Sequence, residues 1–228
     1  MTKLKREIIT TSDGSTTIHI PEWDEQYHSK HGAIQEAYHV FIKHGLDLFQ
    51  NQNISILEIG FGTGLNTFIT YIESEQRNLE IKYVGVEAYP IALEEVSKLN
   101  YVSELQANDL KNVFDQMHQT KWGVKDYLRK GFSLLKRKQF FQDIEDSKSF
   151  DLIYFDAFGA RVQPELWSVE IFQKMINALK VGGVLVTYAA KGSVRRAMLE
   201  VGFSVEKLPG PPGKREMLRA MKVSSDIQ

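Results

Sequence analysis

The sequence predicts an α/β fold with a doubly wound, mostly parallel sheet. Apolar, strand-like runs alternate with segments of helical periodicity from residue 54 to residue 201. A glycine-rich turn joins the first of these strands to the first helix, and three later strands end at or just before an acidic residue. In such a sheet, ligands bind beyond the carboxyl ends of the strands, where the strand order reverses.

Each element follows from the local pattern, and together they form one domain over residues 1–228. Residues 1–50 are an N-terminal extension, with a hairpin over residues 1–25 that turns at Asp13-Gly14 and a helix from residue 32 to about residue 48. Residues 51–228 are the Rossmann-like core. Its expected strands are 54–59, 81–87, 138–142, 150–156 and 183–189. Its expected helices are 65–76, 90–98, 168–179 and 192–201, with a polar helical insert near 107–130 and an antiparallel edge from residue 203.

The glycine-rich turn narrows the choice of ligand. Glycine permits positive φ and a close approach of the backbone to a ligand. A dinucleotide fingerprint requires G-x-G-x-x-G, whereas the glycines here are Gly60, Gly62 and Gly64. Glu58 would repel a pyrophosphate but suits the ammonium group of S-adenosylmethionine. We therefore predict a class I S-adenosylmethionine-dependent methyltransferase fold.

Acids at later strand ends extend the predicted cofactor site. Glu87 ends the second core strand, where a carboxylate can accept both hydroxyls of an adenosine ribose. Asp143 is placed to accept from the adenine amino group, although it also suits the N-cap of a short helix. Asp156 ends an almost wholly apolar strand and opens the loop over residues 157–161. All of these acids are expected to face one cleft.

Composition excludes several chemistries. The chain has no cysteine, which rules out disulfides, thiolate metal sites, iron–sulfur clusters and a cysteine nucleophile. The six histidines show no metal-ligand spacing, so no metal is expected. No apolar run approaches the ~18 residues of a membrane helix, and the N-terminus lacks the apolar region of a signal peptide. These features predict a cytoplasmic protein with no membrane partner.

Several motifs together resemble the MnmC and MnmD family of methyltransferases, which modify the wobble uridine of tRNA. The resemblance covers nearly the whole chain. It rests on Tyr27-His28-Ser29 with Gly32-Ala33, the loop 60–66, the block 156–158 leading to Pro164-Glu165-Leu166-Trp167, Val194-Arg195-Arg196, and the segment 213–218. Residues 159–163 depart from the proline-containing stretch that is common in the family. The family's flavin-dependent oxidase half is expected to be absent, because the sequence ends at residue 228.

The resemblance implies methylation of the aminomethyl nitrogen on the wobble uridine, usually 2-thiolated, with the tRNA anticodon loop as partner. Asp156 is the expected catalytic residue, which orients the amine and accepts its proton as the N–C bond forms. The expected cofactor contacts are Glu58, Gly60, Gly62, Gly64, Asn66, Glu87 and Asp143. The expected substrate contacts are Tyr27, His28, Ser29, Phe158, Trp167, Arg195, Arg196, Lys214 and Arg215.

The charge distribution favours an RNA partner. The net charge is −1, but residues 174–228 hold ten Lys and Arg against four Asp and Glu, whereas residues 1–173 hold 18 against 25. The basic end is therefore the candidate RNA face. An unpaired base could stack on Phe158 or Trp167, although Trp167 suits a core position equally well.

Two other functions remain open from the sequence. A small-molecule amine methyl- or aminopropyl-transferase would retain the glycine loop and Asp156, but it would need further acids in its pocket and no basic tail. A cofactor-binding RNA module without catalysis is the second alternative, and the presence of Asp156 argues against it.

Overall fold

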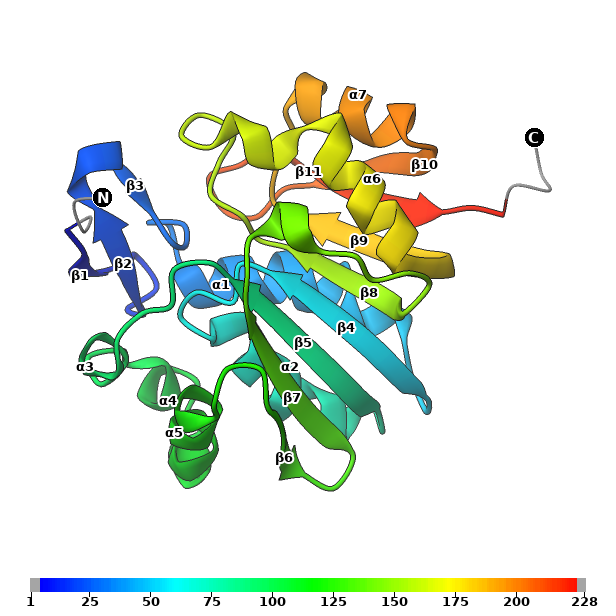
Figure 1. Cartoon of the computed structure of the whole chain (residues 1–228). Coiled ribbons are helices and arrows are strands. Elements are labelled where there is room, and N and C mark those ends of the chain that lie inside the picture. The colour runs from blue at the N-terminus through cyan, green and yellow to red at the C-terminus, as the bar shows by residue number, and fades with distance from the viewer. Residues whose placement is uncertain (1–4, 225–228) are drawn as a thin grey trace.

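The computed structural model describes residues 5–224, so the two ends of the expected 1–228 domain, residues 1–4 and 225–228, lie outside it. Residues 5–224 form an eight-stranded mixed sheet, flanked by helices, and a small three-stranded antiparallel sheet beside it (Figure 1). The large sheet has the order β10-β11-β9-β8-β4-β5-β7-β6. Its strands are β4 (Asn53–Ile59), β5 (Glu80–Glu87), β6 (Lys125–Arg129), β7 (Phe132–Lys138), β8 (Phe150–Phe155), β9 (Leu179–Thr187), β10 (Phe203–Pro209) and β11 (Glu216–Lys222).

The doubly wound topology predicted from the sequence is confirmed. β4 pairs in parallel with β5 on one side and with β8 on the other, β7 extends the sheet beyond β5, and β9 extends it beyond β8. The chain therefore runs outward from β4 in one direction, then returns and runs outward in the other. The strand order reverses between β4 and β8, which places the turn after β4 beside the turn after β8. The antiparallel edge of β10 and β11 is also confirmed.

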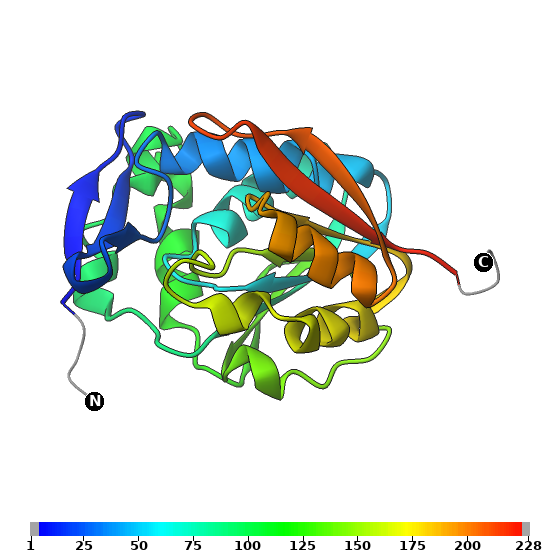
Figure 2. The same cartoon turned by 90° about the horizontal axis from the view of Figure 1, so that it is seen from above.

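Helices cover both faces of the large sheet. α1 (Ala33–Ala37), which continues as a π-helix over Tyr38–Lys43, packs with α2 (Leu65–Gln76) and α5 (Lys111–Gln119) against one face. α6 (Val169–Ala178) and α7 (Gly192–Glu200) cover the other face (Figure 2). α3 (Leu93–Val96) and α4 (Tyr101–Glu104) are short. In residues 5–224, no helix combines the length and apolarity that a bilayer crossing requires.

Strand alternation explains why two buried clusters form. Successive side chains of a strand point to opposite faces, so Ile56 packs toward α2 whereas Leu57 packs toward α6. β8 behaves in the same way, with Tyr154 on the first face and Phe155 on the second. A strand that is buried on both faces is mostly apolar along its length. This pattern allowed β4 and β8 to be predicted as strands from the sequence.

The N-terminal hairpin is also confirmed. β1 (Glu7–Thr10) pairs antiparallel with β2 (Thr16–Ile20), and β3 (Glu25–Gln26) completes the small sheet. The Asp13 side chain organises the turn, because its Oδ1 accepts from Thr11 Oγ1 at 2.7 Å and from the Ser15 amide at 3.1 Å. The small sheet lies beside the end of the large sheet where β4 and β5 finish (Figure 1).

The predictions for residues 90–143 were partly wrong. β7 covers residues 132–138 instead of 138–142, and Phe141–Asp143 is a 3-10 helix. Part of the predicted helical insert is strand β6, which turns into β7 at Gly131 with a φ of 82°. The basic run at residues 136–138 hid the alternation of β7, in which Phe132, Leu134 and even Lys136 point into the protein. Of the predicted helix 90–98, only the short α3 is helical.

Candidate active site

The glycine-rich turn lies between β4 and α2, as the sequence predicted. Gly60 has a φ of 89° and Gly62 a φ of 49°. A Cβ atom at Gly60 would lie 2.6 Å from the carbonyl oxygen of Asp156. Glycine at this position therefore lets the end of β8 approach the turn. The amides of Gly60 and Phe61 both donate to the carbonyl of Val86, which ties the turn to the end of β5.

Glu87 reaches from the end of β5 to the glycine turn. Its Oε2 accepts from the Gly62 amide at 3.1 Å, and its Oε1 accepts from the Tyr89 amide at 2.9 Å. Burial raises the pKa of Glu87, and these two backbone hydrogen bonds oppose that shift. Asp143 ends the 3-10 helix after β7 and is exposed, without a hydrogen bond or ion pair to its carboxyl from residues 5–224. It is not an N-cap, because Phe140 occupies that position.

Asp156 follows β8 directly and lies next to the first residues of α2. Asn66 Nδ2 donates to Asp156 Oδ2 at 2.8 Å. The pKa of Asp156 is raised to about 7, chiefly by burial and then by the charge of Glu36, while the Asn66 hydrogen bond and the charge of Lys214 oppose the shift. A carboxyl group with this pKa exchanges protons near neutral pH, as a general base requires.

The sequence analysis did not predict a partly buried ion pair between Lys214 and Glu36, whose charges both act on the pKa of Asp156. Lys214, in the turn between β10 and β11, pairs with Glu36 of α1 at 2.5 Å, and its Nζ lies 3.8 Å from the centroid of the Tyr188 ring. The Tyr188 hydroxyl in turn donates to the carbonyl of Ala157 at 2.7 Å. Glu36 is an acidic residue among the apolar positions of the predicted helix 32–48. This feature of the sequence could have identified it as a buried charge.

The N-terminal extension covers the glycine turn with aromatic rings. The Phe158 ring lies 4.9 Å from that of Tyr27 and 5.5 Å from that of Trp23, both edge to face. A Cβ atom at Gly62 would lie 3.1 Å from the Tyr27 ring. Arg161 ties the loop after β8 to the extension, because its Nη2 donates to the carbonyls of Trp23 and Asp24 and to Glu25. Trp23 and Arg161 were not predicted as site residues.

The structure corrects the substrate contacts expected of His28 and Trp167, both of which are buried. His28 is buried against Thr17, and desolvation lowers its pKa to about 4, so it is neutral and enclosed in the fold. Ser29 is partly exposed in the turn before α1, where its amide donates to Glu36 and its Oγ accepts from the His31 amide, and its substrate contact stays a prediction. Trp167 is 5% exposed and packs on Phe155. Its Nε1 donates to the carbonyl of Phe158 at 2.7 Å, so it supports the loop from below.

The structure also corrects the role expected of Glu58. This side chain has no exposed surface, so its carboxyl cannot touch a ligand in the open cleft. Its Oε2 instead accepts from Thr67 Oγ1 at 2.9 Å and from the Tyr83 hydroxyl at 3.0 Å. The strand register explains this placement, because Glu58 lies between Gly85 of β5 and Tyr154 of β8 on the face that α2 covers.

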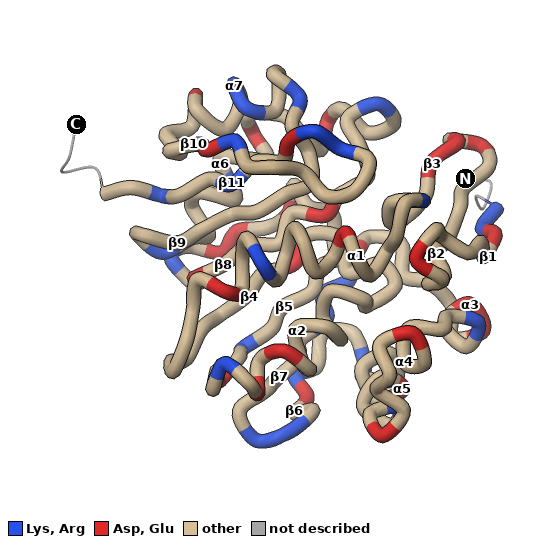
Figure 3. The backbone as a smooth tube through the Cα atoms, turned by 180° about the vertical axis from the view of Figure 1, so that it is seen from behind, with Lys and Arg blue, Asp and Glu red and all other residues tan. Residues whose placement is uncertain are grey.

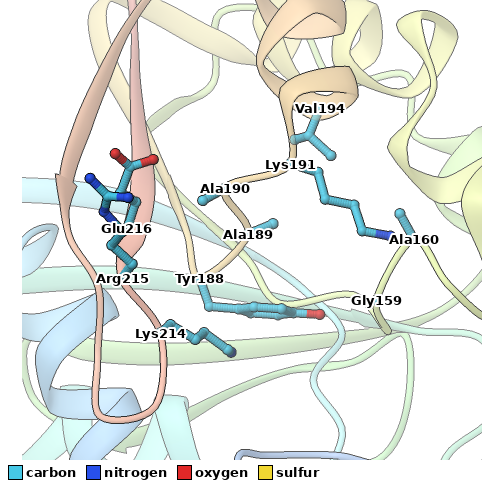
Figure 4. Close-up of a pocket in the computed structure, with 10 residues that line it drawn as sticks. All are labelled: Gly159, Ala160, Tyr188, Ala189, Ala190, Lys191, Val194, Lys214, Arg215 and Glu216. Carbon is cyan, nitrogen blue, oxygen red and sulfur yellow. The ribbon is translucent and has the colours of Figure 1, made fainter.

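A pocket of about 440 Å³ adjoins the loop after β8 (Figure 4). Its walls include Gly159 and Ala160 from that loop, Tyr188 and Lys191 after β9, and Arg215 from the β10–β11 turn. Tyr188 links the pocket to the loop after β8, because its hydroxyl donates to the carbonyl of Ala157, the residue that follows Asp156. The pocket therefore adjoins the loop that Asp156 opens.

Most of the predicted basic face is neutralised within the fold. Lys180, Lys207 and Arg219 form ion pairs with Asp151, Glu216 and Glu206. Lys174 and Lys222 donate to backbone carbonyls. Within residues 5–224, the basic side chains of this region that have neither an ion pair nor a hydrogen bond are Lys191, Arg195, Arg196 and Arg215. They lie on α7 and beside the pocket, where Figure 3 shows Lys and Arg on α7 and the neighbouring strands.

Comparisons with known proteins agree with this geometry. Residues 127–223 match a family described as S-adenosyl-L-methionine-dependent methyltransferase. The chain is 32% identical over 211 residues to the tRNA 5-methylaminomethyl-2-thiouridine biosynthesis bifunctional protein MnmC of Leptospira borgpetersenii. This match covers 86% of the chain and 32% of the relative. The chain is an MnmC-like methyltransferase domain. It spans about a third of the length of the curated relatives that it matches.

Solved structures show the same fold. MnmC2 from Aquifex aeolicus superposes with a TM-score of 0.77 and 24% identity over 98% of this chain and 72% of that one. Spermidine synthase from Thermotoga maritima gives a TM-score of 0.62 at 13% identity, over 97% and 70% of the two chains. The MnmC-like domain therefore has the class I methyltransferase fold predicted from the sequence, and its cofactor is S-adenosyl-L-methionine.

The residues around the glycine turn fit this cofactor. Three positions of the turn, Gly60, Gly62 and Gly64, carry no side chain, Glu87 presents a carboxyl at the end of β5, and Asp143 presents one after β7. Carboxylates at these strand ends suit the hydroxyl and amino groups of an adenosine. Gly60, Gly62, Gly64, Asn66, Glu87 and Asp143 thus remain the predicted cofactor contacts, and Glu58 does not.

The substitution Glu87→Ala tests the cofactor site. We expect it to weaken S-adenosyl-L-methionine binding by about 1.5–3 kcal/mol, the range for hydrogen bonds to a charged group. Because Glu87 also holds the Gly62 amide, Glu87→Gln is the matched variant: it keeps an acceptor for the turn but loses the charge. Calorimetric affinities of both variants within twofold of the parent would remove Glu87 from the cofactor site.

Proposed function

We propose that this MnmC-like domain methylates the exocyclic amine of 5-aminomethyluridine, usually 2-thiolated, at the wobble position of tRNA. The observation that carries the proposal is a carboxyl, Asp156, at the end of β8, followed by a loop that lines a pocket edged by the cations Lys191 and Arg215. Support also comes from the relatives at about 30% identity, whose name refers to 5-methylaminomethyl-2-thiouridine biosynthesis in tRNA.

The chemistry requires a proton acceptor at the reacting amine. When bound, S-adenosyl-L-methionine supplies an electrophilic methyl group. The amine nitrogen that receives it must lose a proton, and Asp156 is the carboxyl group at the cleft whose pKa of about 7 suits that transfer. Asn66 fixes one carboxylate oxygen, which leaves the other for the amine. The aromatic rings of Tyr27, Phe158 and Trp23 pack together next to the glycine turn.

The pocket at the loop after β8 suits a nucleotide. The Tyr188 ring and the small side chains Ala160 and Ala189 give it an apolar wall against which a base can pack. Lys191 and Arg215 at its rim, with Arg195 and Arg196 on α7, can meet backbone phosphates. A target in the anticodon loop is single-stranded, so its base can be splayed out into such a pocket.

The charge of the pocket argues against a diamine substrate. A small-molecule amine or aminopropyl transferase needs a second carboxylate for the distal ammonium group of its substrate. The acid on the pocket wall, Glu216, is paired with Lys207, and Glu36 is paired with Lys214. The similarity to spermidine synthase, at 13% identity, is a similarity of fold and does not itself support a diamine substrate.

The direct experiment offers the protein both substrate classes. Purified protein with labelled S-adenosyl-L-methionine is incubated either with tRNA that carries 5-aminomethyl-2-thiouridine or with free diamines. We expect label in the tRNA and, after digestion, in 5-methylaminomethyl-2-thiouridine, and none in the diamines. Transfer to diamines at a higher rate than to tRNA would replace the proposal with the small-molecule alternative.

The salt dependence of tRNA binding tests the proposed phosphate contacts. For the double variant Lys191→Ala/Arg215→Ala, the slope of log affinity against log salt should fall by about 1.4–1.8, or about 0.7–0.9 per phosphate contact. Lys82→Ala/Lys130→Ala is the matched control. Both lysines are exposed and lie near the starts of β5 and β7, at the other end of the strands from Glu87. Equal slopes for the two double variants in filter binding would move the RNA face elsewhere. The basic run 136–138 is not a suitable alternative RNA face, because Lys136 is buried and Arg137 pairs with Asp146.

A further inference from the structure

A buried lysine lies behind the glycine-rich turn. Lys136, in β7, is 1% exposed. Its Nζ donates to the carbonyl of His118 at 2.8 Å, in the last turn of α5. The same Nζ lies 4.9 Å from the centroid of the Trp122 ring and 5.6 Å from that of the Phe61 ring. Lys136 forms no ion pair with any of residues 5–224, so these contacts offset the burial of its charge.

Phe61 is the residue of the turn that the lysine contacts. It lies between the first two glycines of the turn, and its side chain is 3% exposed. The strand register places Gly85 of β5 opposite Lys136 of β7, and a Cβ atom at Gly85 would lie 2.5 Å from Cδ2 of Phe61. Glycine at this position in β5 therefore lets the Phe61 ring pack against the strand, beside the lysine. A side chain of the cofactor turn is thus anchored between β5 and Lys136.

We propose that Lys136 is a positioning residue for the cofactor turn: its ammonium group holds the Phe61 ring next to the end of α5, so that the turn keeps the shape that binds S-adenosyl-L-methionine. A desolvated cation is attracted to the face of an aromatic ring, and the carbonyl end of a helix also favours a cation. A turn that is already ordered binds a ligand without an ordering cost. Because Lys136 is enclosed in the fold, it acts through Phe61.

The charge of Lys136 makes this role dependent on pH. Burial lowers the pKa of Lys136 to about 8, so the side chain is mostly charged at pH 7 and mostly neutral at pH 9.5. The groups that face it from β5, the glycine turn and the segment after α5 are Gly85, Phe61 and Trp122, which do not titrate. From α5 it meets His118, whose pKa is lowered to about 3, chiefly by burial and then by the Lys136 charge. His118 is therefore neutral over this whole range.

The stability of the fold responds to the same pKa in the opposite direction. The folded-state pKa of about 8 lies below the ordinary value of 10.5, so the unfolded chain binds more protons between these two values. The stability of the parent should therefore rise, relative to that of Lys136→Met, as the pH rises from 8 to 10.5. Loss of the charge stabilises the fold, whereas we expect it to weaken cofactor binding. This opposition separates positioning of the turn from a general effect on the fold.

Calorimetric affinity for S-adenosyl-L-methionine, measured at several pH values from 7 to 9.5, tests the proposal. Methionine is similar to lysine in length and packs well against aromatic rings, but it has no charge. At pH 7, Lys136→Met should bind the cofactor about three- to tenfold more weakly than the parent. The ratio of the two affinities should fall toward one at pH 9.5, because the lysine of the parent is then neutral as well. Any titration of the cofactor itself cancels in this ratio.

Lys138→Met is the matched control, because Lys138 is exposed and lies two residues further along the same strand. Its affinity should equal that of the parent at every pH. Melting temperatures at each pH report the expected stability change in the absence of cofactor. Equal affinities of the parent and Lys136→Met at pH 7, or a ratio that does not change with pH, would overturn the proposal.

A second variant tests the same contact from the side of the turn, and it serves if Lys136→Met does not fold. Phe61→Leu keeps an apolar side chain but has no ring face for the ammonium group. It should also bind the cofactor more weakly than the parent at pH 7, and the ratio of the two affinities should fall as the pH rises to 9.5. A ratio that is independent of pH would show that Phe61 acts by packing alone and would contradict the role of Lys136.

Discussion

Replacement of Asp156 by asparagine is expected to slow single-turnover methyl transfer by about 10²–10⁴-fold, because asparagine keeps the shape of the side chain but cannot accept a proton. Its Oδ1 can still accept from Asn66, so the local geometry should survive. Affinity for S-adenosyl-L-methionine should be nearly unchanged. Rapid-quench measurement with tRNA that carries the aminomethyl group gives the rate, and calorimetry gives the affinity.

The pH profile adds a second signature of the same residue. Because the pKa of Asp156 is raised to about 7, the fraction that can accept a proton falls as the pH drops below 7. The parent rate should therefore fall at acidic pH, and the residual rate of Asp156→Asn should lack the inflection that Asp156 causes. Asp109→Asn, an exposed change in the 3-10 helix Asn108–Leu110, serves as control and should match the parent. An Asp156→Asn rate within fivefold of the parent would reduce this residue to positioning.

The change Lys214→Met should destabilise the protein by about 1–3 kcal/mol, because it leaves the buried Glu36 carboxylate without its paired cation. Glu36 is 6% exposed, whereas the Lys214 side chain is one-third exposed, which moderates the loss. Methionine keeps most of the apolar contact with Tyr188. Denaturant unfolding measures the free energy, and the double variant Lys214→Met/Glu36→Gln should recover much of it, because no charge is then left buried alone.

This prediction separates a structural role of Lys214 from the substrate contact that the sequence predicts. An ion pair with Glu36 is a structural role, so the salt slope of tRNA binding should stay at the parent value in Lys214→Met. A phosphate contact would instead lower the slope by about 0.7–0.9 and leave stability unchanged. The second result would contradict the assignment of Lys214 to the fold and return it to the RNA face.

Local patterns were enough to predict much of this molecule. The order of strand, glycine turn and helix at residues 54–76 is a property of consecutive residues, and so is the apolar strand that ends at Asp156. Strand ends in a parallel sheet meet at one edge, which is why Gly60, Glu87 and Asp156 could be grouped before the structure was known. β6 and β7 could not be read in this way, because lysine and arginine interrupt their apolar alternation.

The sequence by itself thus determined the fold class, the cofactor and the strand ends that hold the site, because periodicity and glycine geometry act within a few residues. Only the tertiary structure decided what each charge near the site does. Glu58 lies two residues before the first glycine, yet α2 and β5 bury it completely. Lys214 meets Glu36 across 178 residues of chain. The energy of a charge depends on its burial and on its neighbours in space, and remote segments supply both.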